Sequence, residues 1–415
     1  MPWKATDEMK ERTKFVLEWE RRWNEAEGGR VNMTELCRVF GISRQTGHAL
    51  VKRYRDGGND LAMIAPRSKR PKSSPTAIPP ELEDLIVAAR KMYPRWGPRK
   101  LHQVLVERNP NKLVPSASVM AKILKRRGLT STRKRRRRGP VASVASPFAG
   151  CTAPNDVWCI DFKGWFLTED GVKCYPLTLI DAFSRMFLRC EALTEPDGKQ
   201  VQRILDSAFV EYGLPKVLRS DGGPPFASTG PARLTELSVW LLRLGLETEI
   251  IAPGKPQQNG RLERLHRTLK AETASPPEAN CAAQQRCFDV WRGQYNHIRP
   301  HEALGMRCPG DVYRRSRSSY PRPLLKPTSF EPFSHIARLD RNGVLKWHRR
   351  NVLISSALKY EDVELEPDVA NQARWTVSWG AILLGYLDEE HPDRGLLVPR
   401  RKRGTPRELS RMSFQ

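Results

Sequence analysis

The sequence predicts a multidomain protein with N-terminal all-α helix-turn-helix units, a central α/β core built on a mixed sheet, and a small C-terminal β-barrel. Three observations predict this order. Apolar residues recur at helical spacing through the first 130 positions. From residue 150, short segments rich in β-branched and aromatic residues alternate with helical ones, which is typical of an α/β domain. After residue 334, only short strand-like segments remain.

The charge of the chain favours a nucleic-acid partner. Its 415 residues include 71 Lys and Arg against 46 Asp and Glu, a net charge of +25. Such an excess indicates a polyanionic partner, nucleic acid more often than a membrane surface, although a solvated basic surface is the plain alternative. No apolar run is long enough to span a membrane and no secretory signal is evident, so we expect no membrane partner.

The cysteines and histidines predict no disulfide framework and no zinc site. The eight cysteines are scattered and form no C-x-x-C pair, which suits a reducing cytoplasm. His297 and His301 lie four positions apart in YNHIRPHEAL, but a proline separates them and no cysteine pair follows. We expect these histidines to pack or hydrogen-bond within a loop rather than to bind zinc.

Residues 1–65 are predicted to form a helix-turn-helix DNA-binding domain. A short helix ends near Gly41, which suits a tight turn, and Ser43 is a typical N-cap for the helix that follows. That second helix is basic, and residues near its start would contact base edges if the motif binds DNA. Many helical hairpins share this outline without binding nucleic acid. The candidate contacts are Arg44, Gln45 and His48.

Residues 66–80 are rich in Pro, Ser and basic residues, which indicates a linker. Residues 81–140 are predicted to form a second helix-turn-helix unit, in which Ser116 begins a basic helix. This unit ends in a basic arm that contains no acid. Such a run is usually a solvated arm, but beside two helix-turn-helix candidates it suggests contacts with the DNA backbone. The candidate residues are Arg133, Lys134, Arg135 and Arg136.

Residues 151–316 are predicted to form the central α/β core. Three consecutive strands followed by alternating helices and strands indicate a mixed sheet. The expected strands are VWCIDF, KCYPLTLIDA, RMFLRCEAL, KVLRSD and LETEIIAP. Helices are expected over Asp197–Tyr212, over Arg233–Leu244, and again from Gly260.

The C-terminal part is predicted to be a small β domain. Residues 317–332 are rich in Pro and Ser and suggest a further linker. Several short strands follow, so residues 330–390 are expected to form a small β-barrel, with Asn342-Gly343 as a hairpin turn. Residues 391–415 form a basic tail that we expect to be disordered.

Three carboxylates stand where the central domain would present them at one edge. Asp161 lies in an apolar strand, where an unpaired charge is costly. Asp221 ends a strand and precedes two glycines that let the backbone turn. Glu263 begins a helix behind a Gly- and Pro-rich loop, on the face that also carries Arg267 and Lys270.

Converging carboxylates suit metal-assisted phosphoryl transfer. Hard cations such as Mg²⁺ prefer oxygen ligands, and two ions about 4 Å apart can clamp an in-line displacement. Each acid also has a structural interpretation. Asp161 could cap a strand end, Asp221 could be a turn residue, and Glu263 could pair with Arg267 at i,i+4.

Residues 151–305 resemble the catalytic core of DDE transposases related to retroviral integrases, particularly that of bacterial insertion-sequence transposases. The resemblance rests on WCIDF, LTLIDAFSR, RSDGGPPF, PGKPQQNGRLERLHRTLK and YNHIRPHEAL. It implies a ribonuclease H-like fold for the core. The flanking helical units and the small β domain are also similar to that family. By the match of motifs, the resemblance assigns catalysis and metal binding to Asp161, Asp221 and Glu263.

The match has two departures. Gly222 stands where many relatives have Asn, and Asp221 and Glu263 are 42 positions apart, more than is common in the wider group. Two other acids are weaker candidates. Asp181 lies in a matched block but outside the triad, and Glu272 lies more than two helical turns beyond Glu263.

The resemblance implies a transposase that binds the terminal inverted repeats of its element and uses two Mg²⁺ (or Mn²⁺) ions for DNA cleavage and strand transfer. The implied partners are double-stranded DNA, both repeat and target, and further copies of the chain on that DNA. Arg267 and Lys270 are expected to contact DNA, and the implied location is the bacterial cytoplasm, at the nucleoid. Two alternatives stay open: a nuclease that cuts without joining, and a DNA-binding regulator with an inactive core.

Overall fold

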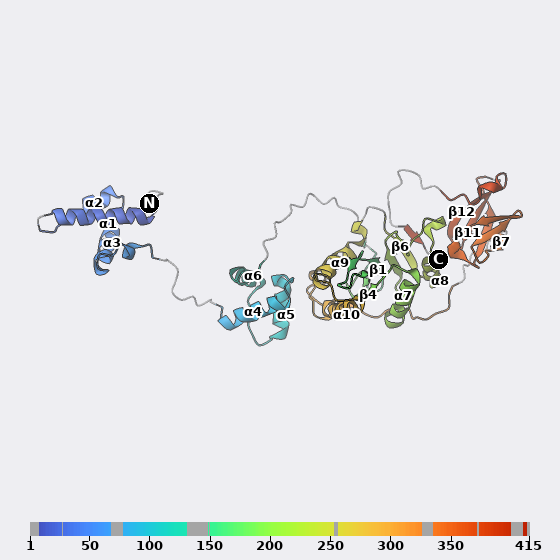
Figure 1. Cartoon of the computed structure of the whole chain (residues 1–415), viewed down its shortest axis with the longest axis horizontal. Coiled ribbons are helices and arrows are strands. Elements are labelled where there is room, and N and C mark those ends of the chain that lie inside the picture. Colours follow the sequence, from blue (N-terminus) through green and yellow to red (C-terminus); the bar gives the residue numbers. More distant parts are fainter. Residues whose placement is uncertain are drawn as a thin grey trace. The chain divides into compact units, whose positions relative to one another are not determined.

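The structure is a computed structural model, and it describes residues 8–26, 28–67, 78–130, 148, 150–252, 256–325, 335–371, 373–399 and 410–412. The chain forms two compact units, Met1–Ile78 and Pro79–Gln415. Figure 1 colours the elements in chain order. Among the described residues, no helix combines the length and the apolar character needed to cross a membrane.

The first unit contains the expected helix-turn-helix. Its helices are α1 (Glu8–Glu25), α2 (Met33–Val39) and α3 (Arg44–Asp56), followed by the 3-10 helix η1 (Leu61–Ile64). The turn between α2 and α3 uses Gly41 at φ +67°, and Ser43 Oγ accepts a hydrogen bond from the backbone N–H of Thr46 at 3.2 Å. The predicted turn residue and N-cap are therefore both confirmed.

Close contact between α2 and α3 depends on a glycine inside α3. A Cβ atom at Gly47 would lie 2.4 Å from the Sγ atom of Cys37 and 3.1 Å from Phe15 Cζ. Phe15, Leu36 and Cys37 are buried in the core of this unit. The absence of a side chain at Gly47 therefore sets how near the two helices can pack.

The second helical segment has three helices, α4 (Pro80–Met92), α5 (Pro98–Arg108) and α6 (Ala117–Arg126), where the sequence predicted a helix pair. Ser116 is the N-cap of α6, as expected, although its side chain makes no capping hydrogen bond. Tyr93 and Trp96 stack in the turn between α4 and α5, with ring centroids 4.0 Å apart. The basic arm of residues 133–136 lies outside the described residues.

The core is a mixed sheet, as predicted. Its strands are β1 (Val157–Phe162), β2 (Phe166–Leu167), β3 (Lys173–Asp181), β4 (Phe187–Leu193), β5 (Val217–Ser220) and β6 (Glu247–Ile250). β1 runs antiparallel to β3 and parallel to β5, and β5 runs parallel to β6. The carboxyl ends of the three parallel strands β1, β5 and β6 therefore meet at one edge of the sheet.

Helices cover both faces of this sheet (Figure 1). On one face, α7 (Gly198–Tyr212) and α8 (Glu236–Arg243) pack on a core that contains Trp158, Ile160 and Leu218. On the other, α9 (Gly260–Thr273) and α10 (Cys281–His297) pack on Cys159, Ile180 and Phe187. Alternate residues of β1 face the two layers because successive strand side chains point to opposite sides. The helix expected from Arg233 begins three residues later, after Thr235.

Short elements connect these layers. They are η2 (Pro231–Arg233), η3 (Pro256–Asn259), η4 (Glu302–Leu304) and α11 (Pro309–Val312). The motif YNHIRPHEAL runs from the end of α10 into η4. Its Tyr295 belongs to the same hydrophobic core as Leu262 and Leu265 of α9.

The C-terminal strands form open sheets, so the predicted closed barrel is not confirmed. One sheet has the order β12 (Ile382–Asp388), β11 (Arg374–Trp379), β10 (Asp362–Pro367) and β7 (His335–Arg338), and the other contains β8 (Val344–Trp347) and β9 (Arg350–Leu353). Their 3-10 turns are η5 (Ser356–Leu358) and η6 (Pro392–Arg394). β12 and β7 are the edge strands of the first sheet and do not pair with each other, so that sheet is open.

The expected Asn342-Gly343 turn forms, but the two strands that it joins, β7 and β8, belong to different sheets. Asp340 Oδ1 accepts hydrogen bonds from the N–H groups of Asn342 and Val344, and this turn joins β7 to β8, which do not pair. The real hairpin joins β8 and β9 through His348 and Arg349, at φ +44° and +65°. The Asp340 N–H also donates to the Val344 carbonyl at 3.0 Å, so the Asn-Gly segment is a closed turn between strands of two separate sheets.

The tail is not wholly without structure. Ser410–Met412 forms β13, which pairs antiparallel with β6 at the edge of the core sheet. A short strand from the chain's own end thus covers an otherwise open sheet edge. The expectation of a disordered tail is wrong for these residues, because the edge strand supplies backbone hydrogen bonds that sequence patterns do not reveal.

Candidate functional site

Asp161 and Asp221 lie at the same edge of the core sheet. Asp161 is the penultimate residue of β1, and Asp221 directly follows β5. Because β1 and β5 are neighbouring parallel strands, their carboxyl ends bring the two acids together. The fold therefore places two of the three predicted acids at the edge where open α/β sheets bind ligands.

The two aspartates share a half-buried, negatively charged environment. Burial, together with the charge of Asp221, raises the pKa of Asp161 to about 7. Burial also raises the pKa of Asp221, although the N–H of Gly223 donates to its Oδ1 at 3.3 Å and favours the charged form. Two carboxylates that resist ionisation in this way suit a cation as their common partner.

Glu263 lines a cavity at the start of α9. It is exposed on the first turn of α9 and lines a cavity of about 690 Å³. The same cavity is lined by the cations Arg95, Lys163, Arg264, Arg267 and Lys270. The predicted DNA contacts Arg267 and Lys270 thus lie around the third acid.

The three acids do not form a closed cluster. Within the described ranges, the only trio of potential ligand atoms within 4.8 Å of one another is Asp388, Glu390 and His391, in the C-terminal domain. The segment before Glu263 includes residues 253–255, which lie outside the described residues. Convergence of Glu263 on the two aspartates therefore stays a prediction.

His266 is a component of the site that the sequence did not reveal. It lies one helical turn after Glu263 and is buried, with Nε2 2.6 Å from Thr178 Oγ1 and Nδ1 3.9 Å from Asp161 Oδ2. The Thr178 hydroxyl donates to the backbone oxygen of Asp161 at 3.0 Å. Desolvation lowers the pKa of His266 to about 3, so the ring is neutral. The only signal in the sequence was its place on the buried face of α9, four residues after Leu262.

The two weaker candidates have structural roles. Asp181 is fully buried and accepts hydrogen bonds from the N–H of Asn155, the N–H of Ser184 and the hydroxyl of Ser184. Glu272 accepts from Trp291 Nε1 at 2.8 Å and pairs with Arg299 at 2.8 Å. Both carboxylates are occupied by partners within the fold, so neither is free to bind a metal.

Three family models match the chain. Two models described as integrase core domain match residues 152–256 and 244–309, and a homeodomain-like domain model matches residues 46–124. Among solved structures, a chain of a simian T-cell lymphotropic virus intasome in complex with PP2A regulatory subunit B56 gamma has a TM-score of 0.34. It is 16% identical to this chain, and the match covers 76% of this chain and 100% of that one.

Relatives come from insertion elements and retroviruses. The chain is 29% identical over 299 residues to the insertion element IS407 uncharacterized 31.7 kDa protein of Burkholderia multivorans, covering 70% of this chain and 94% of that protein. It is 34% identical over 118 residues to the Pol polyprotein of feline endogenous virus ECE1, covering 28% of this chain and 10% of the polyprotein. The chain is of the insertion-sequence transposase type, with a retroviral-integrase-like core.

In this transposase, Gly222 follows the second acid for a steric reason. A Cβ there would lie 2.6 Å from Arg233 Nη2, which donates to the Gly222 carbonyl at 2.7 Å. Neither Gly222 nor Gly223 has a left-handed φ. Gly222 therefore leaves room for Arg233 beside Asp221, whereas a Cβ at Gly223 would lie nearest to the Asp221 carboxylate, at 3.4 Å. The backbone bends at both glycines, as expected, without a left-handed φ.

The candidate base contacts of the transposase are accessible. Arg44, Gln45 and His48 are all exposed near the start of α3, in the helix-turn-helix. The homeodomain-like match begins within the same helix. The backbone contacts predicted for Arg133, Lys134, Arg135 and Arg136 lie outside the described residues.

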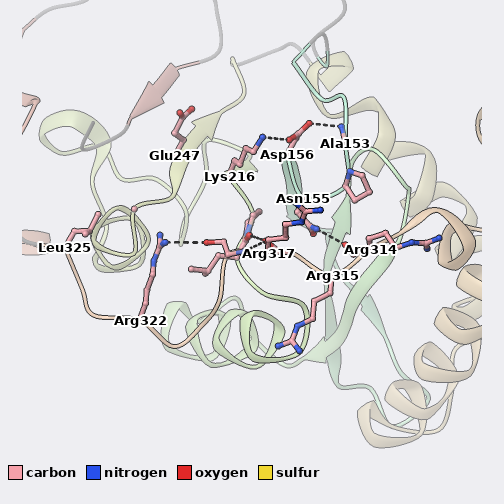
Figure 2. Close-up of a pocket in the computed structure, with 16 residues that line it drawn as sticks. Ala153, Asn155, Asp156, Lys216, Glu247, Arg314, Arg315, Arg317, Arg322 and Leu325 are labelled. Atoms are coloured by element: carbon pink, nitrogen blue, oxygen red, sulfur yellow. Dashed lines mark hydrogen bonds and ion pairs between the residues drawn. The ribbon is translucent and has the colours of Figure 1, made fainter.

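A second basic cavity lies at the opposite edge of the core sheet (Figure 2). It has a volume of about 900 Å³ and lies beside the amino ends of β1 and β5. Its cations largely have partners: Lys216 pairs with Asp156 at 2.8 Å, and Arg315 donates to the Val210 carbonyl at 2.9 Å. These cations are thus held by partners within the core, and the cavity lies at the edge of the sheet away from Asp161 and Asp221.

Proposed function

We propose that this transposase binds the terminal inverted repeats of its element and catalyses metal-dependent DNA cleavage and strand transfer. The observation that carries the proposal is the juxtaposition of Asp161 and Asp221 at one sheet edge, where burial raises both pKa values. Glu263 lines the adjoining cavity among five cations. Acids for a metal beside cations for phosphate are the combination that phosphodiester chemistry needs.

Asp161, Asp221 and Glu263 fit divalent cations as ligands. Carboxylate oxygens are the groups that Mg²⁺ and Mn²⁺ prefer, and a cation between the half-buried aspartates would relieve their mutual repulsion. We propose that the three acids hold two such ions, with Asp161 shared between them. Bound there, the ions would activate the attacking oxygen and stabilise the leaving oxygen.

The remaining side chains of the site would hold DNA and restrain the acids. Lys163, Arg267 and Lys270 line the cavity beside Glu263 and would hold the phosphodiester by charge. The neutral ring of His266 restrains Asp161 from the side of α9 without adding charge. The reaction needs no Ser or Tyr nucleophile, because a water oxygen and then a DNA 3′-OH attack phosphorus directly.

The helical units at the N-terminus would supply recognition. Arg44, Gln45 and His48 lie at the exposed start of α3, the position from which recognition helices contact base edges. We propose that several copies assemble on the paired ends of the element, in the bacterial cytoplasm at the nucleoid. Joining two DNA ends to one target requires at least two bound ends held together.

A gel assay tests the proposal. The full-length protein is incubated with labelled duplex from the DNA that flanks its own gene, with Mg²⁺ or with EDTA. We expect Mg²⁺-dependent release of a 3′-OH end and a joined product with a second duplex. Cleavage without joining would instead indicate a nuclease, and binding without cleavage would indicate a regulator with an inactive core; either result would overturn the proposal.

A further inference from the structure

A third cavity lies on the flank of α9, beside the candidate active site. It has a volume of about 430 Å³ and is bounded by α9, the turn before β4, the motif YNHIRPHEAL and α5. Five cations line it, Lys100, Arg185, Arg261, Arg264 and Arg299. Arg264 and Gly260 also line the cavity that contains Glu263, so the two cavities adjoin.

Most of these cations have no ion-pair partner in the part of the chain that the structure describes. Across the described residues, no ion pair involves Lys100, Arg185, Arg261 or Arg264. Arg299 pairs with Glu272 at 2.8 Å, and the one described acid that lines the cavity, Glu302, lies 3.8 Å from Arg99. Arg185 and Arg261 instead donate to the Ala182 carbonyl, which orients the guanidinium groups but leaves their charge unbalanced.

Burial, with neighbouring positive charge as the smaller cause, disfavours the charged forms of two cations in this cavity. Burial, and then the charge of Arg299, lowers the pKa of Lys100 to about 8, and burial with the charge of Arg261 lowers that of Arg185 to about 10. His301 also lines the cavity, and its buried Nε2 has no hydrogen-bond partner among the described residues. A cluster that costs stability in this way is expected where a ligand of opposite charge binds.

We propose that this cavity binds a backbone phosphate of the DNA substrate. The proposal rests on the proposed function, because it assigns the DNA a path past the acids. A phosphodiester is the ligand whose charge balances several cations at once, and guanidinium groups match its oxygens in pairs. Arg264 adjoins Glu263 in sequence and faces both cavities. A DNA strand held at the acids would therefore pass Arg264 and enter this third cavity, on the flank of α9.

The test measures DNA binding by the full-length protein, with Ca²⁺ in place of Mg²⁺ to limit cleavage. The probe is the labelled duplex that flanks the gene, at several salt concentrations. Arg264→Gln and Lys100→Gln each remove one charge from the cavity without removing a described hydrogen bond or ion pair of that side chain. Arg203→Gln is the matched control, because Arg203 is exposed on α7, on the other face of the sheet.

Each cavity variant is expected to weaken binding roughly tenfold, equally across sequences, and to lower the slope of log affinity against log salt by about 1. Because both side chains serve one phosphate, the double variant should lower the slope no further. Arg264→Lys keeps the charge and should keep most of the affinity. Melting temperatures should stay unchanged or rise, since each Gln removes a repelling charge.

Three results separate the two proposals. If the wild-type chain bound the duplex while both Gln variants matched Arg203→Gln in affinity and slope, the phosphate assignment would be overturned and the proposed function would stand. The phosphate assignment would equally be overturned if the variants bound DNA normally and changed only the elution volume of the protein, which would indicate an acidic protein surface as the occupant. If the wild-type chain bound no DNA, the proposed function itself would fail.

Discussion

At the scale of single residues, the acids of this transposase differ in their position, their burial and their hydrogen-bond partners. Asp161 and Asp221 lie at the ends of neighbouring parallel strands, and burial raises both pKa values. Asp181 and Glu272 are engaged in hydrogen bonds and an ion pair. Glu263 is exposed and lines a cation-rich cavity. Its proposed role is therefore the one that most needs a direct test.

We expect Glu263→Gln to lower metal-dependent cleavage by orders of magnitude. The substitution keeps size but removes one of the three charges proposed to hold two ions, and both ions stabilise the same transition state. DNA binding should survive, because it depends on cations and not on this acid. Cleavage is measured at equal DNA occupancy.

The control for this variant is chosen from the structure. Glu272 is unsuitable, because its loss would free Arg299 and Trp291. Glu169 is exposed, and its side chain makes no described hydrogen bond or ion pair, so Glu169→Gln should leave cleavage nearly intact. If Glu263→Gln and Glu169→Gln cleaved alike, the assignment of Glu263 would be wrong.

His266 should act as a positioning residue for Asp161. His266→Leu keeps much of the volume but removes the contact with Thr178, so we expect cleavage to fall about 10- to 100-fold, as for other groups that orient metal ligands. His266→Asn retains a hydrogen-bonding side chain and should recover most of the rate. The apparent Mg²⁺ affinity is measured together with the melting temperature. A fall in stability with unchanged cleavage per folded molecule would show a merely structural role.

Lys100 predicts a pH dependence of DNA binding. Its pKa of about 8 reflects burial, followed by the charge of Arg299, with Glu302, Glu272 and Arg264 also close. A bound phosphate would raise that pKa, so affinity should be constant well below pH 8 and should fall as pH rises through about 8. Binding isotherms between pH 6.5 and about 9.5 check this. Lys100→Arg stays charged and should abolish the dependence; if it behaved as wild type, another group would be responsible.

At the scale of elements, close approach decides which helices can pair. Gly47 in α3 is the clearest instance, since any Cβ there meets the buried Sγ of Cys37 at 2.4 Å. Arg243 of α8 pairs with Glu361 at 2.8 Å, and Leu234, Val239 and Leu242 join the core of the C-terminal sheets. The C-terminal strands therefore complete their core with residues in and beside α8.

Two glycine substitutions should shift stability in opposite directions. Gly47→Ala improves helix propensity but forces Cys37 aside, so we expect a net loss of about 1–2 kcal/mol from overpacking. Gly293→Ala lies in α10 with no atom within 4 Å of the added Cβ, and should gain about 0.5–1 kcal/mol. Hydrogen exchange of the α3 and α10 amides reports each helix separately. Equal protection changes in the two variants would contradict the packing argument.

At the scale of the whole molecule, the chain divides into two compact units. Met1–Ile78 contains the first helix-turn-helix, and Pro79–Gln415 contains the second helical segment, the core and the C-terminal sheets. The second segment contacts the core directly: the Arg299 guanidinium lies 5.6 Å from the Trp96 ring centroid. A truncation should therefore be made before residue 79 rather than after residue 140.

Removing residues 1–78 should leave a folded protein that no longer recognises the element ends. The remainder keeps its own hydrophobic cores, so its unfolding should stay cooperative. Its remaining DNA affinity should be weak and sensitive to salt, because it would rest on phosphate contacts. Footprinting on the flanking DNA measures recognition. Protection of the repeats by the truncated protein would contradict this division of labour.

The sequence by itself determined the order of the folds, the helix-turn-helix with its Gly41 turn and Ser43 cap, the strands of the core, and the two aspartates at strand ends. These features are local: they follow from periodicity, from caps, and from motifs read along the chain. The choice of Asp161, Asp221 and Glu263 among the acids came from the motif resemblance and not from spacing alone.

Only the tertiary structure decided which distant residues meet. Thr178 and His266 are 88 positions apart and meet at 2.6 Å beside Asp161, and the basic cavity draws on α5, α9 and the motif YNHIRPHEAL. The C-terminal strands form open sheets, and the Asn342-Gly343 turn joins strands of two different sheets. Local propensities fix where elements begin and end, but the contacts between elements depend on how their faces pack, and no single stretch of sequence contains that information.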